Sequence, residues 1–174
     1  MSYRKHNPEV VYTTDTLPLI GSNDVAFLKE EAAKNPRERM RICVHTGPED
    51  VLHEMFILHK KGCYVRPHRH NSKAESLMVL EGEVDLFTFD DQGKILEVVP
   101  LASYGNSKPF FYRMQKPTYH SLLIKSENLV FLETTSGPFT AEGSTFPAWA
   151  PANDDLEGQK VFMKKMEDHS RNLR

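Results

Sequence analysis

The sequence has little cysteine and no marked excess of charge of either sign, and each of these absences excludes a class of protein. Its two cysteines, Cys43 and Cys63, are too few for a disulfide scaffold, so we interpret both as partly buried apolar thiols. The formal net charge is −2, and there is no basic stripe or RNA-binding motif. Nucleic acid is therefore not expected as a partner.

Long apolar runs are also missing. No stretch of about 18 consecutive apolar residues is present, and the N-terminus lacks the apolar core of a signal peptide. We therefore expect no membrane-spanning segment and a cytoplasmic location. With 174 residues, the chain has the length of one domain with a proper core and short extensions.

The pattern of residues divides the chain into three parts. Residues 1–21 hold two prolines and a glycine and predict an irregular arm or an edge strand. Residues 22–151 form the expected single domain, and residues 152–174 form a charged tail. We interpret the Pro-rich segment at 146–151, with its one tryptophan, as an apolar strap across the outside of the domain.

Two short helices are expected, one near each end of the chain. Ser22 or Asn23 can cap a helix through 26–35, and the proline that follows ends it. Asp154 or Asp155 can cap a C-terminal helix that runs to about residue 171.

From Arg39 onward the apolar residues recur at every second position, which is typical of a half-buried strand. Met40, Ile42 and Val44 form one apolar set, and we expect this set to be an outer face that suits a homodimer. Further strands are predicted at 52–60, 64–70, 76–80, 83–90, 94–99, 110–114, 120–125 and 129–134. Many short strands without intervening helices indicate an antiparallel sandwich or barrel.

One stretch carries a metal-site spacing. Between Gly62 and Gly82 the sequence reads glycine, five residues, His-x-His, four residues, glutamate, six residues and glycine. Side chains two apart on a strand point to the same face, so His68 and His70 can converge on one point. Glu75 lies far enough along the chain to return its carboxylate to that point after a short turn.

This spacing resembles the first motif of the cupin superfamily, and the chain further resembles the WbuC-type cupin fold metalloproteins. The likeness covers most of residues 22–151, namely 37–45, 64–70 with Lys73 and Glu75, 89–93, 112–113, 120–121, Glu133, 137–139 and 146–151. It implies an all-β fold, the cupin double-stranded β-helix (jelly-roll barrel), with a short N-terminal helix and a short C-terminal helix.

The resemblance also implies a ligand set for one divalent transition metal per chain, with Fe, Mn, Ni, Co, Cu and Zn all left open. The second cupin motif departs from its usual form, because Gln115 and Pro117 replace a proline and a glycine, and Ile124 replaces an asparagine. Its histidine is kept. The implied ligands are His68, His70, Glu75 and His120.

Other residues are expected to line the cavity around the metal. Tyr64 and Arg66 share the register of His68 and His70 if the strand stays regular up to Pro67. Glu133 alternates with apolar residues and can also point inward. We therefore predict catalytic roles for Glu133 and Tyr64 and substrate-binding roles for Arg66, Lys73, Arg113 and His45.

Three functions remain open at this point. The first is a metal-dependent isomerase or epimerase that acts on a small polar or anionic molecule, such as a sugar or sugar phosphate in polysaccharide-related metabolism. The second is an Fe-dependent oxygenase, and the third is a cupin that binds a small ligand without turning it over. Fold and family do not decide among them.

Overall fold

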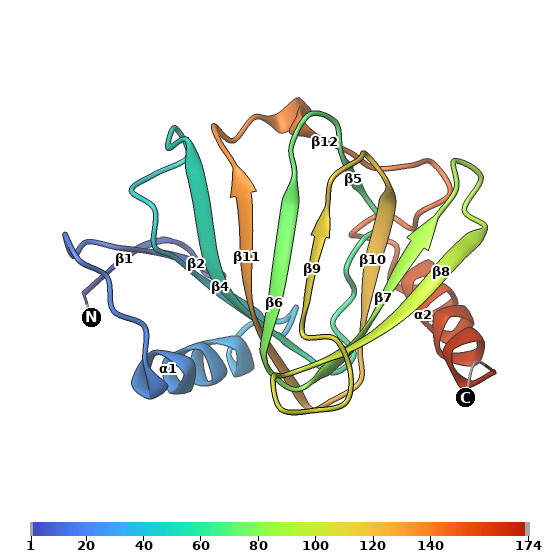
Figure 1. Cartoon of the computed structure of the whole chain (residues 1–174), viewed down its shortest axis with the longest axis horizontal. Helices are drawn as coiled ribbons and strands as arrows, with labels where there is room; N and C mark the ends of the chain where they lie inside the picture. Colours follow the sequence, from blue (N-terminus) through green and yellow to red (C-terminus); the bar gives the residue numbers. More distant parts are fainter. Residues whose placement is uncertain (1, 173–174) are drawn as a thin grey trace.

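The computed structural model describes residues 2–172, so residues 1, 173 and 174 of the predicted arm and tail lie outside the described residues. Strands are the main regular structure of the chain, and α1 and α2 lie at opposite ends of the molecule (Figure 1). The elements are β1 (Tyr3–Asn7), β2 (Val10–Thr13), α1 (Ser22–Ala33), β3 (Arg39–Cys43), β4 (Leu52–Lys60), β5 (Arg69–His70), β6 (Glu75–Glu81), β7 (Glu83–Phe89), β8 (Ile95–Ala102), β9 (Phe111–Met114), β10 (Tyr119–Ile124), β11 (Asn128–Ser136), the short 3-10 helix η1 (Ala141–Gly143), β12 (Ser144–Thr145) and α2 (Leu156–Arg171).

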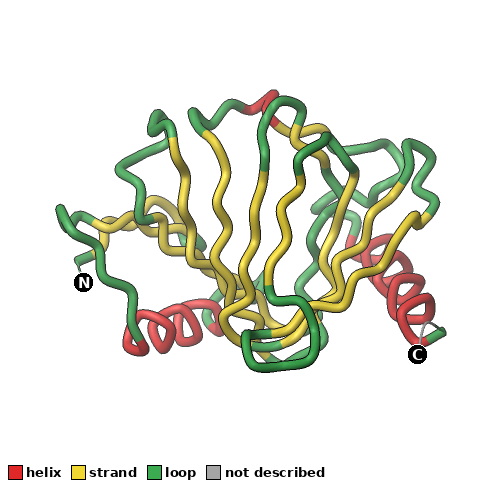
Figure 2. The backbone as a smooth tube through the Cα atoms, in the orientation of Figure 1, coloured by secondary structure: helices red, strands yellow, loops and turns green. Residues whose placement is uncertain are grey.

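Hydrogen bonding divides these strands among three sheets rather than one closed sheet. The largest has the order β1-β2-β3-β4-β11-β6-β9, the second has the order β10-β7-β8, and β12 pairs with β5. All pairs are antiparallel except β2 with β3. The strands curve around a common interior (Figure 2). The N-terminal arm is a strand hairpin within the largest sheet, so the prediction of an irregular arm or an edge strand holds only for its edge strand, β1.

The main core lies between the two larger sheets. It is built from apolar side chains at alternate positions, because a strand with one buried face presents every second residue to it. The seven-stranded sheet contributes residues such as Ile57, Leu77 and Phe131, and the three-stranded sheet contributes Leu86 and Leu122. The two sheets therefore pack face to face, as in a sandwich.

Helix α1 covers the outer face of the seven-stranded sheet. Leu28 and Ala32 are fully buried there against Met40 and Ile42, and Val44 packs against the same cluster. The expectation that this apolar set forms an open dimerisation face is therefore wrong, because the chain's own helix occupies it. The helix begins at Ser22 with Gly21 in the capping position, so neither Ser22 nor Asn23 is its cap.

Helix α2 covers the outer face of the three-stranded sheet. Its Phe162 and Met166 belong to a cluster with Phe87 and Phe89 of β7. Trp149 joins this cluster, and its indole N–H donates to the Asp91 carbonyl at 3.1 Å. The segment that carries Trp149 thus crosses the outside of the sheet and connects the core domain to α2.

Asp155 caps α2, since its carboxylate accepts the backbone N–H of Gly158 at 2.9 Å. Replacing it by alanine should lower the free energy of unfolding by about 1 kcal/mol, which is about 2–4 °C in Tm for a chain of this length. Asp154→Ala is the matched control, because no side-chain hydrogen bond of Asp154 is found among residues 2–172. Equal losses in the two variants, measured by thermal unfolding, would contradict this assignment.

Candidate metal centre

Four side chains from three strands meet at one end of the space between the sheets. His68 and His70 lie just before and within β5, Glu75 begins β6, and His120 lies in β10. One ligand atom from each residue lies within 4.8 Å of every other. These are the four residues that the sequence analysis selected as ligands.

The backbone fixes this convergence. His68 and His120 form an isolated antiparallel bridge in which each N–H donates to the other's carbonyl, at 3.1 and 2.9 Å. His70 pairs with Ser144 in the β5–β12 sheet. The predicted strand over 64–70 is much shorter than expected, because the segment before His68 forms no ladder and Pro67 has no N–H to donate.

Each histidine ring is oriented through its Nδ1 atom. The Nδ1 atoms of His68 and His120 lie 2.8 and 2.9 Å from the carbonyl oxygens of Arg66 and Thr118. A carbonyl only accepts, so Nδ1 carries a proton in both rings and Nε2 is the atom that is left to bind a metal. His70 Nδ1 lies 2.9 Å from the Ser144 hydroxyl, which can donate to it, so His70 Nε2 can carry the proton that it donates to Glu75 in the metal-free protein. Such hydrogen bonds to the outer nitrogen are typical of metal-bound histidines.

Glu75 is the buried acceptor at the centre of the cluster. Its Oε2 lies 2.8 Å from His70 Nε2 and 3.5 Å from His120 Nε2, and its Oε1 accepts the Tyr112 hydroxyl at 2.5 Å. Burial raises the pKa of Glu75. The charge on His120 and the hydrogen bonds from His120 and His70 outweigh this effect and hold the pKa of Glu75 well below its usual range. Glu75 is therefore ionised.

The donor set fits a transition metal. Three imidazole nitrogens and one carboxylate suit Fe, Mn, Co, Ni, Cu or Zn, and their softness does not separate these ions. His68 is neutral, which is the form that binds metal, since burial and then the charge on His120 lower its pKa to about 4. Burial lowers the pKa of His120, but the charge and hydrogen bond of Glu75 outweigh it, so the pKa of His120 is raised overall. Metal binding to His120 would therefore release a proton.

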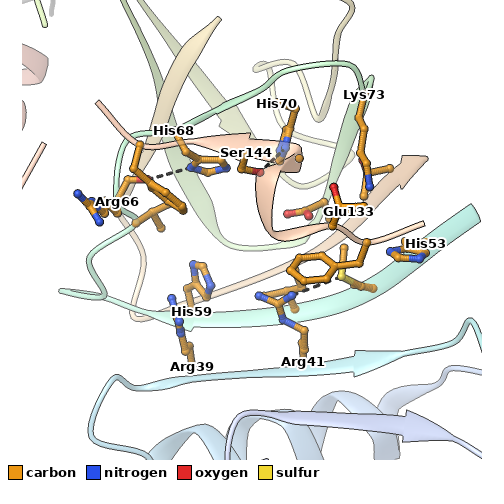
Figure 3. Close-up of a pocket in the computed structure, with 18 of the residues that line it drawn as sticks. Arg39, Arg41, His53, His59, Arg66, His68, His70, Lys73, Glu133 and Ser144 are labelled. Carbon is orange, nitrogen blue, oxygen red and sulfur yellow. Dashed lines mark hydrogen bonds between the residues drawn. The ribbon is translucent and has the colours of Figure 1, made fainter. Parts of the chain in front are cut away.

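A cavity of about 290 Å³ opens beside the cluster. Figure 3 shows His68, His70 and Ser144 on one side of it and Arg39, Arg41 and His59 on the opposite side. Among the lining residues that the structure describes, Glu133 is the one carboxylate, against three arginines and one lysine. The cavity therefore favours a small anion.

The sheet register places Glu133 next to the ligand cluster. Thr135 of β11 pairs with Glu75, and Glu133 pairs with Leu77 two residues further along the same face. Glu133 and Glu75 are thus diagonal neighbours. Burial, and then the charge on Glu75, raises the pKa of Glu133 to about 7, and its side chain points into the cavity (Figure 3).

The other predicted site residues divide into two groups. Arg66 and Lys73 line the cavity, and Lys73 donates to the Pro138 carbonyl. Tyr64, Arg113 and His45 are not among the described residues that line it. Arg113 is exposed on β9, and His45 is buried behind His53, with the two rings stacked 4.2 Å apart.

Tyr64 faces a different space from Glu133. Its hydroxyl donates to the Pro151 carbonyl at 3.0 Å, and its ring lines a second cavity beside α2. Burial raises the pKa of Tyr64 to about 12. The shared register with His68 depended on a regular strand, and residues 63–67 do not form one. The structure therefore gives no support to a catalytic Tyr64.

Two arginines and two histidines that line the cavity were absent from the predicted site. They come from β3 and β4, which pair with Arg39 opposite His59 and Arg41 opposite Ile57. For the two histidines a signal was present in the sequence, because every second residue from position 53 to 59 lies on one face of the predicted strand at 52–60. The missed residues are Arg39, Arg41, His53 and His59.

Comparison with known proteins supports the fold and gives no function. A family model described as a domain of unknown function (DUF6016) matches residues 20–101, which include His68, His70 and Glu75. No curated protein matches. Within residues 2–172, neither helix has the length and apolar character needed to cross a membrane.

The solved structures that resemble this one are cupin-fold proteins. The capsular polysaccharide assembling protein CapF from Staphylococcus aureus has a TM-score of 0.51 and 14% identity, over 65% of this chain and 32% of its own. Protein SO0799 from Shewanella oneidensis has a TM-score of 0.46 and 10% identity, over 59% of this chain and 66% of its own. Oxalate decarboxylase from Bacillus subtilis has a TM-score of 0.48 and 18% identity, over 62% and 27%.

These likenesses are too distant to show more than the fold. The chain also spans less than two thirds of each of these three relatives. The resemblance to the WbuC-type family stays a prediction.

Proposed function

We propose that this protein is a metal-dependent enzyme that moves a proton on a small, oxygen-rich anion of the sugar phosphate class. The observation that carries the proposal is the position of Glu133, a half-buried carboxylate in the same cavity as His68 and His70, with a pKa of about 7. A general acid or base works best when its pKa lies near the working pH.

His68, His70, Glu75 and His120 would hold the metal, which would supply Lewis acidity toward substrate oxygens and so make an adjacent C–H group more acidic. Glu133 would then accept that proton at its carboxylate and return it to a neighbouring atom. A metal cation near Glu133 favours its ionised form, so the carboxylate would serve as the base at neutral pH.

The remaining cavity residues bind and orient the substrate. Arg66 and Lys73 supply positive charge on the side of the metal ligands, and neither has a carboxylate partner within 4.0 Å among residues 2–172. The Arg66 guanidinium lies over the ring of Phe146, with Cζ 4.9 Å from the ring centroid, and this cation–π contact holds the charge in place. A sugar-related substrate agrees with the fold likeness to CapF, a capsular polysaccharide assembling protein.

Hydrogen exchange at carbon is the direct test. Metal-loaded protein is incubated in D₂O with a panel of aldose and ketose phosphates, and deuterium incorporation next to the carbonyl is followed by proton NMR. Exchange should occur with at least one compound and should be about 10²- to 10⁴-fold slower in Glu133→Gln. Glu97→Gln, an exposed glutamate on β8, is the matched control.

Two outcomes would contradict the proposal. One is exchange that Glu133→Gln leaves unchanged. The other is a compound that stabilises the protein against unfolding without any exchange, which would identify a binding protein instead.

A further inference from the structure

The side of the cavity opposite the metal ligands carries a cationic cluster that proton transfer does not use. Arg39 of β3 pairs directly with His59 of β4, and Arg41 lies two residues further along β3. Directly paired residues and residues two apart share one face of a sheet. All three line the cavity, and Figure 3 shows them together on its floor.

Arg41 and His59 have few hydrogen-bond partners among the described residues. Within the described residues, the Arg41 side chain has one contact, from Nη1 to the Met55 sulfur at 3.5 Å, and no carboxylate within 4.0 Å. His59 is only 6% exposed, and its Nδ1 has no hydrogen-bond partner in that part of the chain. A buried polar atom without a partner destabilises the folded protein, so this atom points to a group from outside the chain that completes its hydrogen bond.

The charge at this floor is only partly neutralised. The Glu9 carboxylate accepts a hydrogen bond from Arg39 Nε at 2.9 Å, but the same carboxylate also accepts from Arg37. Its single negative charge is therefore shared between two arginines. Burial, followed by the charges of Arg39 and Arg41, lowers the pKa of His59 to about 3, so this ring is neutral and can donate one hydrogen bond.

We propose that Arg39, Arg41 and His59 form a subsite for the phosphate group of a phosphomonoester substrate. This inference rests on the proposed function, which supplies the reacting end of the same molecule at the metal ligands. A phosphate dianion matches two guanidinium groups in charge, and its three terminal oxygens can accept from both arginines and from His59. A carboxylate carries one negative charge, so it would neutralise only one of the two guanidinium groups.

The distance between the two ends of the cavity suits one small molecule. In the seven-stranded sheet, β3 and β6 are separated by β4 and β11, which is three strand spacings or about 14 Å between backbones. Side chains extend into this space from both sides. A substrate of sugar phosphate size can therefore reach both the floor and the ligand cluster.

Titration with inorganic phosphate tests the subsite, with the affinity measured by calorimetry on the full chain. Arg41→Gln should weaken phosphate binding roughly 10- to 100-fold, because it removes charge-assisted hydrogen bonds. Arg171→Gln, an exposed arginine at the end of α2, is the matched control and should bind as the wild type does. Acetate, as a carboxylate probe, should bind at least tenfold more weakly than phosphate.

The double variant His68→Ala/His70→Ala separates this subsite from the metal, because phosphate can also bind a metal ion directly. Phosphate affinity in this variant should stay within about threefold of the wild type. If Arg41→Gln fails to fold, Arg41→Lys keeps the charge but loses the planar fork, and it should still weaken binding severalfold.

Three results would overturn the subsite: unchanged affinity in the Arg41 variants, loss of binding only in the double histidine variant, or equal binding of acetate and phosphate. Failure of the proposed function would give a different result: no deuterium would enter the carbon next to the carbonyl, while phosphate would still bind at Arg39, Arg41 and His59.

Discussion

Replacing Glu133 by glutamine should stabilise the metal-free protein by about 3 kcal/mol at pH 8 and change its stability little at pH 4. The pKa of Glu133 is raised to about 7 in the folded protein, against 4.5 for an ordinary glutamate. Each pKa unit corresponds to about 1.4 kcal/mol between the two protonation states. Glutamine has nearly the same shape and carries no charge at any pH.

The direction follows from which state binds the proton more tightly. Because the folded-state pKa is above the unfolded value, the contribution of Glu133 to stability is full below about pH 4.5 and is lost as the pH rises through about 7. The gain in the glutamine variant should therefore grow between these two values and level off above pH 8. A bound metal would reduce the gain, since a nearby cation favours the carboxylate.

Chemical unfolding of chelator-treated protein at several pH values measures this effect. Glu97→Gln, the exposed control on β8, should give a curve parallel to that of the wild type. A Glu133→Gln curve that is also parallel would mean that Glu133 is not held in an unfavourable environment. The combination of higher stability with lost proton transfer is the usual sign of a carboxylate kept for function.

The second large effect concerns the predicted ligands His68 and His70, just before and within β5. Adding a binding metal at 100 times its Kd should stabilise the wild type by about 2.7 kcal/mol, or about 5–10 °C in Tm. The variant His68→Ala/His70→Ala should show no such shift, because it removes two of the four converging ligand atoms.

A matched pair of histidines tests whether the loss is specific. His6→Ala/His169→Ala removes two exposed histidines from β1 and α2 and should keep the full metal-induced rise in Tm. Differential scanning fluorimetry with and without metal gives both values. An equal rise in the two double variants would place the metal elsewhere.

The local parts of this structure could be predicted from the sequence because they depend on short-range patterns. The strand at 52–60 has the predicted bounds, and α2 begins after Asp155, one of the two residues predicted to cap it. The three ligands between Gly62 and Gly82 come from one turn and its flanking residues. Both glycines have positive φ, as the turns that they form require.

The cavity floor could not be predicted in the same way. That Arg39 and His59 share a face depends on the register between two strands, and that they face His68 depends on how the two sheets pack. Neither is a local property of the chain. For the same reason the apolar set at Met40 and Ile42 indicated a covered face without indicating that α1 is the cover.

The prediction that Tyr64 lines the cavity was wrong because it assumed a regular strand before His68. Tyr64 was assigned to the cavity by counting back from His68 in steps of two, but residues 63–67 form no ladder. Arg66 nevertheless lines the cavity, with its guanidinium over Phe146, so only one of the two residues follows the pattern. A proline next to a predicted ligand strand is a reason to stop such a count.

Metal content is the measurement that tests the central claim most directly. Wild type and His68→Ala/His70→Ala are purified in parallel without added metal or chelator and analysed by plasma mass spectrometry. The account predicts about one equivalent of a transition metal per chain in the wild type and its loss in the variant. No metal in the wild type, or metal retained in the variant, would contradict it and would leave the four converging side chains as a metal-free hydrogen-bond network.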